Sequence, residues 1–207
     1  MQLNGGMFFD VAETYDKGFI AVGGHDSKAY LLKVDVSGNI QWAKYYDIVN
    51  SSNICQSVVQ TNDSGYIVTG VAGLFTTYDV QLSRLDANGN LLWVKAYGGG
   101  GDDQGTAVVP TSDNGFLVTG YTNSFGAGNY DAFLLKTDSV GVIQWAKTYG
   151  GANVDAAWGL TTTNNSEYVL GGYTQSFGAG GKDFYLVKTT SAGVLQYTTG
   201  DTNTFLS

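Results

Sequence analysis

Cysteine, histidine and proline are nearly absent from this sequence, which has one residue of each. Cys55 has no partner for a disulfide within the chain, and we expect it to be a small buried hydrophobe. Cysteine content therefore does not indicate the redox compartment. With His25 as the only imidazole, a structural zinc site and a histidine-based catalytic triad are both disfavoured. We expect no metal and no cofactor.

Charge is also scarce, at 14% of the 207 residues, with a net charge of −8. Nucleic-acid affinity comes mainly from Lys and Arg, which number only 10, so nucleic acid and anionic membranes are excluded as expected partners. No apolar run approaches the length of a membrane span, and the N-terminal segment lacks the pattern of a signal peptide. Its first residues, MQLNGG, resemble the end of a preceding repeat, which favours a chain cut from a longer secreted protein.

What the sequence does contain is a repeat centred on an aromatic residue. The segments read GNIQWAKYY, GNLLWVKAY, GVIQWAKTY and GVLQYTTG, at 38–46, 89–97, 141–149 and 193–200. Their central residues are Trp42, Trp93, Trp145 and Tyr197. The period is about 52 residues, within the range of β-propeller blades. A residue present in every copy usually builds the copy, so the repeat predicts architecture more directly than function.

Each copy divides into four strand-like segments separated by turn residues, placed in the third copy at 106–111, 115–122, 131–138 and 141–149. The second and third segments are apolar on both faces, which indicates sheets that stack on one another. We therefore predict an all-β fold, a β-propeller with four blades of four antiparallel strands in a single domain. The expected blades lie near 5–47, 53–98, 103–150 and 155–200.

The two ends of such an array each leave an apolar face to be covered. We expect a closed four-bladed monomer, because small residues in the first strand permit a steep wedge. The alternatives are half of an eight-bladed propeller formed by a homodimer, and an array that has lost neighbouring blades. An open crescent is disfavoured because it exposes too much apolar area.

Two kinds of tight turn recur in the repeat. The first kind follows a Thr-x-Asp-x-Gly pattern and ends at Gly65 and Gly115, and the second kind contains Gly89 and Gly141. Glycine adopts positive φ without steric cost, so we predict positive φ at all four.

The string that runs through 97–150, YGG, D, T, D, GF, VTGYT, SFGAG, D, FLLKTD, G, W, K and YGG, resembles the bacterial β-propeller repeat of large secreted and surface proteins. The first copy departs from the pattern, with Lys28 in place of a recurring aspartate. The resemblance implies a noncatalytic extracellular scaffold or binding module and assigns neither a ligand nor a catalytic residue.

The recurring aspartates Asp79, Asp131 and Asp183 invite two interpretations. They could ring the axis for Ca²⁺ or a sugar hydroxyl, or each could cap its loop by accepting backbone N–H bonds. The second is preferred because these residues recur with the repeat.

Departures from the repeat are the better candidates for a site. Trp158 stands where the other copies have Phe9, Gln56 and Thr106. Aromatic residues also occupy the longer loops, namely Tyr121, Tyr173, Phe125, Phe177 and Phe75. Aromatic rings stack on sugar faces while polar side chains bond hydroxyls. We therefore predict a ligand site built from Trp158, Asp155, Tyr121, Tyr173 and Asp103.

The function expected from these features is a noncatalytic binding or adhesion module of an extracellular or cell-surface protein, with glycan as the first ligand class to test and another protein as the second. A different class, a polysaccharide-directed hydrolase or lyase, would use the loop carboxylates of Asp102, Asp103 and Asp155. A third hypothesis is a structural spacer without ligand. An enzyme should show a cleft with a carboxyl pair and a strongly shifted pKa.

Overall fold

The computed structural model describes residues 6–26, 28–46, 52–73 and 77–199, and throughout these ranges the chain forms strands and turns without a helix. The first sheet contains β1 (Met7–Glu13), β2 (Phe19–His25), β3 (Lys28–Val34) and β4 (Ile40–Tyr46). The second contains β5 (Ser52–Gln60), β6 (Tyr66–Gly73), β7 (Asp79–Leu85) and β8 (Leu91–Tyr97). The third contains β9 (Asp103–Pro110), β10 (Phe116–Thr122), β11 (Asp131–Thr137) and β12 (Ile143–Tyr149). The fourth contains β13 (Asp155–Thr162), β14 (Tyr168–Thr174), β15 (Asp183–Thr189) and β16 (Leu195–Thr198).

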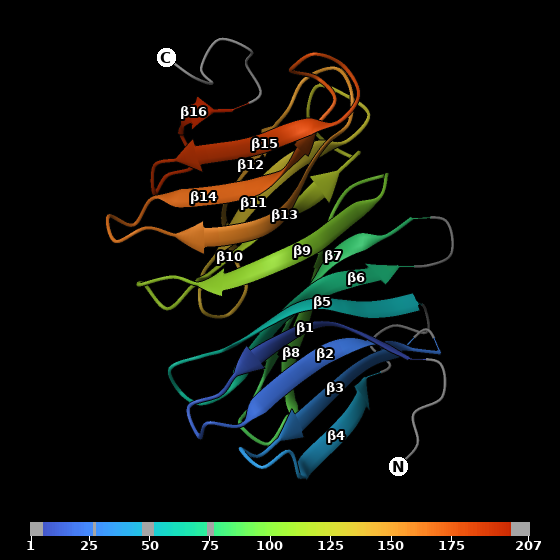
Figure 1. The fold of residues 1–207 in the computed structure, drawn as a ribbon, viewed down its shortest axis with the longest axis vertical. Coiled ribbons are helices and arrows are strands. Elements are labelled where there is room, and N and C mark those ends of the chain that lie inside the picture. The colour runs from blue at the N-terminus through green and yellow to red at the C-terminus, as the bar shows by residue number, and fades with distance from the viewer. Residues whose placement is uncertain (1–5, 27, 47–51, 74–76, 200–207) are drawn as a thin grey trace.

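Each sheet is an antiparallel meander in which consecutive strands pair, so the predicted all-β architecture of four four-stranded blades is confirmed. The sheets follow one another along the longest axis of the molecule, with the first and fourth at opposite ends (Figure 1). No helix in the described ranges is long and apolar enough to cross a bilayer.

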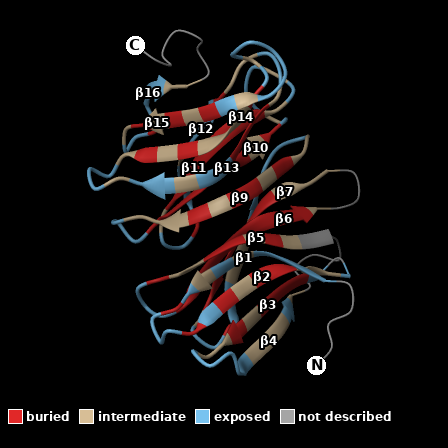
Figure 2. Ribbon diagram, viewed as in Figure 1, coloured by how far each residue is buried: buried red, intermediate tan, exposed pale blue. Residues whose placement is uncertain are grey.

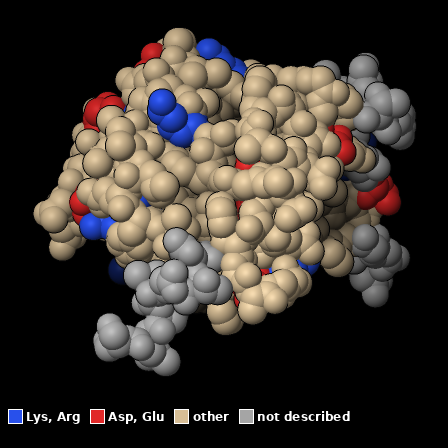
Figure 3. Space-filling view, turned by 90° about the horizontal axis from the view of Figure 1, so that it is seen from above, with Lys and Arg blue, Asp and Glu red and all other residues tan. Residues whose placement is uncertain are grey.

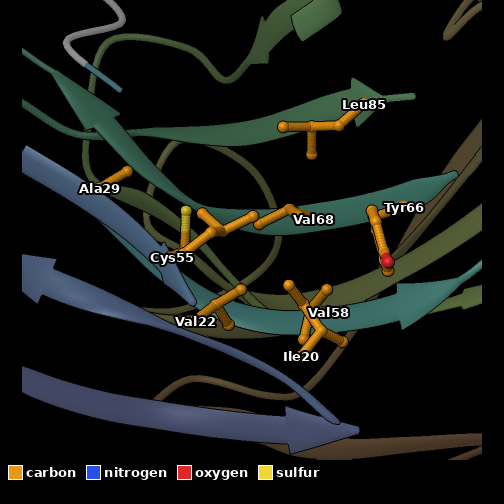
Figure 4. Close-up of a cluster of buried hydrophobic side chains, with 9 residues drawn as sticks. Ile20, Val22, Ala29, Cys55, Val58, Tyr66, Val68 and Leu85 are labelled. Carbon is orange, nitrogen blue, oxygen red and sulfur yellow. The ribbon is translucent and has the colours of Figure 1, made fainter. Parts of the chain in front are cut away.

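The apolar core is divided among the three junctions between neighbouring sheets. Ile20 and Leu31 of the first sheet meet Val58, Tyr66 and other residues of the second in one cluster (Figure 4). Equivalent clusters join the second sheet to the third and the third to the fourth. The central strands β6 and β11 of the two middle sheets are buried on both faces, whereas the last strand of each sheet is largely exposed or half-buried (Figure 2). Burial of Cys55 in the first junction agrees with its predicted role as a small hydrophobe.

The expected closure into a ring is not found in the described residues. Extensive strand contacts between sheets join neighbours only, and none joins the first sheet to the fourth. A steep wedge needs small side chains along the innermost strand, but a β-bulge adds a further residue there, and this residue is Phe9 at one end of the array and Trp158 at the other. Apolar side chains at both ends are consequently exposed, including Val11 and Phe184.

In the first three sheets, the aspartate of each Thr-x-Asp-x-Gly turn binds a buried Lys or Arg from the third strand of the same sheet. Lys136 of β11 donates to both carboxylate oxygens of Asp113, at 3.0 and 2.8 Å, and that carboxylate also accepts from the Thr111 hydroxyl and the Gly115 N–H. Lys33 with Asp16 and Arg84 with Asp63 repeat the arrangement in the first two sheets. Hydrogen bonds from Thr14 and Lys33 keep the pKa of Asp16 well below its usual range.

The prediction of positive φ was right for one kind of turn and wrong for the other. Gly89 and Gly141 have φ of +71° and +75°. In the Thr-x-Asp-x-Gly turns the left-handed residue is instead the one before the glycine, Ser64 or Asn114. Glycine is needed at Gly115 for space, because a Cβ there would lie 2.2 Å from the carbonyl oxygen of Thr137.

Candidate functional site

The first strand of every sheet contains a β-bulge at the same repeat position. The pairing register skips one residue in each sheet, namely Phe9, Gln56, Thr106 and Trp158. In the third sheet the bulged Thr106 is buried, and its hydroxyl donates to the carbonyl oxygen of Ala157 in the fourth sheet at 2.8 Å. Trp158 occupies this position in the last sheet of the described chain and is 49% exposed. The position that serves a junction in the third sheet therefore displays an indole in the fourth, as it displays Phe9, 43% exposed, in the first.

Three aromatic rings meet at this point, and we call Tyr121, Tyr130 and Trp158 the aromatic patch. The ring centroids of Trp158 and Tyr121 lie 5.7 Å apart, and those of Tyr121 and Tyr130 lie 5.6 Å apart in an edge-on arrangement. Tyr121 comes from the end of β10, while Tyr130 forms an isolated bridge with Val154. Burial raises the pKa of both tyrosines above the ordinary value.

Polar groups border the aromatic patch on two sides. The carboxylate of Asp102 accepts the backbone N–H of Tyr78 at 3.0 Å, and its other oxygen lies 3.5 Å from the Tyr130 hydroxyl. The Lys182 ammonium stands 4.0 Å above the ring of Tyr173, near the end of β14. This cation–π contact fixes the lysine over that ring. The patch thus has an apolar platform with one acceptor and one donor at its edges.

Asp155 and Asp103, which the sequence placed in the site, instead anchor loops inside the fold. The Asp155 carboxylate is fully buried and accepts bonds from the Thr174 and Ser176 hydroxyls and from the Gly151 N–H at 2.7 Å. Asp103 binds the equivalent groups of the third sheet, the hydroxyls of Thr122 and Ser124 and the N–H of Gly99. Because their oxygens are engaged and buried, neither carboxylate faces the ligand surface.

Among the recurring aspartates, Asp131 acts as a loop cap, whereas Asp183 Oδ2 is buried without a hydrogen-bond partner in the described residues. Asp131 is buried and accepts the N–H groups of Ala127 and Gly128 at 2.9 and 3.1 Å, as the capping hypothesis predicted. Asp131 and Asp155 also lie on either side of Gly150, where a Cβ would come within 2.1 and 2.7 Å of their oxygens. Burial, with the nearby Asp155 charge, raises the pKa of Asp131. The described residues contain no cluster of three or more potential metal ligands.

A cavity of about 500 Å³ lies between the second and third sheets, away from the aromatic patch. Its walls are largely apolar and include Val80, Phe125, Phe133 and Ile143. The one carboxylate in its lining is Asp103, whose oxygens are already bonded to its own loop. The cavity therefore lacks a free pair of carboxylates for hydrolysis.

The structure brings together Trp158 and Tyr121 from the predicted site and adds Tyr130, which the sequence analysis missed, while the Tyr173 ring lies under Lys182. Departure from the repeat gave no signal for Tyr130, because the second copy has Tyr78 at the same position and only the fourth differs, with Lys182. Phe75 falls outside the described residues. Phe177 stacks on Tyr185 within the fourth sheet, with ring centroids 6.1 Å apart.

No protein-family model matches the chain, and no curated protein matches it. The proposal below is therefore based on the geometry of the residues themselves.

Proposed function

We propose that this protein is a noncatalytic binding or adhesion module of an extracellular or cell-surface protein, and that the aromatic patch binds glycan. The observation that carries the proposal is the half-exposed indole of Trp158 packed beside Tyr121 at a break in the repeat. The equivalent Thr106 of the third sheet is buried in a junction, whereas Phe9 of the first sheet is exposed like Trp158.

The chemistry of the aromatic patch suits a neutral or weakly charged sugar. The apolar face of a pyranose ring can stack on an indole, while its hydroxyls bond the Tyr130 hydroxyl, the Asp102 carboxylate and the Lys182 ammonium. Charged residues are few and scattered on the face in Figure 3, so that face offers little attraction to polyanions.

The hydrolase or lyase alternative receives less support from the same geometry. Asp103 and Asp155 are buried and bonded to their own loops, and Asp102 is held by the N–H of Tyr78. A general acid or base must reach the substrate, which these two buried carboxylates do not.

A glycan-binding screen followed by calorimetric titration tests the proposal. Trp158→Ala should weaken binding of any glycan that the parent protein recognises by about tenfold or more, because it removes the stacking platform. Tyr15→Ala is the matched control, since Tyr15 is also an exposed aromatic residue but lies in the turn between β1 and β2. Equal silence of parent and Trp158→Ala across the screen would reject glycan binding and favour the spacer hypothesis.

A further inference from the structure

The three junctions between sheets share one docking arrangement. The tryptophan of the last strand packs against the first residue of the next sheet's second strand, and its indole covers a turn glycine of that sheet. In the last junction Trp145 lies 6.1 Å from Tyr168, ring centre to ring centre, and a Cβ on Gly193 would come within 2.8 Å of the indole. Trp93 and Trp42 make the same contacts with Phe116 and Gly141 and with Tyr66 and Gly89.

A tyrosine four residues beyond each tryptophan completes the junction. The hydroxyl of Tyr149 donates to the carbonyl oxygen of Gly193 at 2.8 Å, and that of Tyr97 donates to Gly141 at 2.7 Å. Tyr46 binds Gly89 in the same way. Every sheet from the second to the fourth is therefore held by a Trp-x-x-x-Tyr segment of the sheet before it.

The first sheet has the receiving half of this junction, and in the described chain nothing occupies it. Phe19 begins β2 and is 43% exposed, whereas its equivalents Tyr66, Phe116 and Tyr168 are 2–5% exposed. Gly38 has the same left-handed φ as the other turn glycines, but a Cβ there would meet nothing within 4 Å. Val11 is 62% exposed, and Val58 and Val108, at its position in the next two sheets, are 1% exposed.

The fourth sheet does not supply the missing half. It has Tyr197 in place of tryptophan, and Asp201 follows where the other copies have tyrosine. Phe184, the second residue of β15, is 88% exposed, while the equivalent residues Ala29, Val80 and Ala132 are smaller and buried against the next sheet. A second copy docked head to tail, or closure of one chain, would therefore set Phe184 against the first sheet without an indole for Phe19.

We infer that the outer face of the first sheet, comprising Val11, Phe19 and Gly38, binds another sheet of this same repeat that ends in Trp-x-x-x-Tyr. The partner contributes an indole over Gly38 and Phe19 and a tyrosine hydroxyl for the Gly38 carbonyl. The interface continues the three junctions already present and does not depend on the glycan proposal.

The spacing of the repeat allows a direct test. Residues 103–149 added immediately before Met1 place the new Tyr149 nineteen residues ahead of Phe19, the spacing that separates Tyr97 from Phe116. Val11→Cys then reports on coverage through its rate of reaction with a thiol reagent, because the natural Cys55 is buried. Val140→Cys, at an exposed turn of the third sheet, is the control.

The added sheet should slow the labelling of Val11→Cys by about tenfold or more and leave Val140→Cys unchanged. The same extension with its tryptophan and tyrosine both replaced by alanine should restore rapid labelling. Residues 53–97, which end in Trp93 and Tyr97, provide a second extension in case the first does not fold. Rapid labelling with both folded extensions would overturn the inference.

The chain without an extension tests whether a second copy of the chain, or closure within one chain, covers the outer face of the first sheet. Val11→Cys should react rapidly at every protein concentration. Protection that increases with concentration, together with a doubled mass in sedimentation, would show that a second copy covers the face and would overturn the inference. Protection independent of concentration would show closure within one chain, with the same consequence.

Discussion

Trp145 and Trp158 lie on strands consecutive in the chain, β12 at the end of the third sheet and β13 at the start of the fourth, yet one is part of a junction and the other is displayed. Trp145 packs between Tyr168 and the turn at Gly193 of the following sheet. Trp158 contacts Tyr121 on one side and leaves half of its surface to solvent. The difference follows the repeat, because Trp145 has a tryptophan equivalent in two other sheets and Trp158 has none.

The comparison teaches that, of these two tryptophans, the one that recurs builds the fold and the one that departs from the repeat remains available for binding. Asp155 recurs as Asp103 and likewise anchors a loop, whereas Tyr130 joins the aromatic patch although it recurs as Tyr78 in the second sheet. The predictions that follow test this separation by altering residues of both kinds.

Trp145→Ala should have the largest effect on stability. Loss of the indole leaves a cavity against Tyr168 and uncovers the turn at Gly193, so we expect the free energy of unfolding to fall by about 3 kcal/mol. Urea unfolding followed by circular dichroism measures this change. A loss as small as that caused by Trp158→Ala would contradict the assignment of Trp145 to the junction.

Two adjacent glycines of β14 provide the next test. A Cβ on Gly172 would lie 1.9 Å from the carbonyl oxygen of Ala156 in the paired strand, while a Cβ on Gly171 would meet nothing within 4 Å. Gly172→Ala should therefore lower the free energy of unfolding by roughly 2 kcal/mol, and Gly171→Ala should leave it nearly unchanged. Equal melting temperatures for the two variants would show that β13 and β14 are not paired in this register.

The pairing of Asp113 with Lys136 should affect how the free energy of unfolding changes at acid pH. Burial raises the pKa of Asp113, but hydrogen bonds from Lys136 and Thr111 outweigh it and lower the pKa to about 2, below the value of ~3.9 for an unfolded chain. The stabilisation is therefore present above about pH 4 and is lost as the pH falls through about 2.

Asp113→Asn should lower the free energy of unfolding at pH 7 by about 1 kcal/mol, a modest value because half of the carboxylate side chain is exposed. The difference from the parent should shrink as the pH falls from 5 to 2, in unfolding curves recorded across that range. A difference that stays constant over this range would show that the carboxylate charge does not support Lys136.

Much of the fold was predictable because the residues that recur are those that pair and stack. The Trp-centred segments, the turns and the doubly apolar strands located all four sheets. Closure was not predictable, because it depends on whether the outer faces of the first and fourth sheets fit each other. Phe8, Val11 and Phe184 are exposed on the two end sheets, and the sequence does not show how their side chains would pack. In the turn before β10 the left-handed residue is Asn114 and not Gly115. Glycine is needed at 115 because a side chain there would meet the carbonyl of Thr137, a contact between residues distant in sequence.

The candidate site was predictable in part for the same reason. Trp158 and Tyr121 stood out by type and position, and the structure brings their rings together. Asp155 and Asp103 were expected to face the ligand, but hydroxyl and N–H donors from distant loop residues such as Ser176 and Ser124 enclose them. Tyr130 was missed because its contact with Tyr121 depends on the path of the loop between β10 and β11.

Trp158→Ala should have the smallest effect on stability, below about 0.5 kcal/mol, because the side chain is half exposed. Thermal unfolding beside Trp145→Ala measures this difference under the same conditions. A large loss of stability would assign Trp158 to packing.

Calorimetric titration of the two tryptophan variants with one glycan recognised by the parent tests the central claim most directly. We predict that folded Trp145→Ala retains the affinity of the parent despite its lower stability, and that Trp158→Ala keeps the stability but loses at least about tenfold in affinity. The opposite pattern, with binding lost in Trp145→Ala and retained in Trp158→Ala, would contradict the separation between residues that build the repeat and residues that bind.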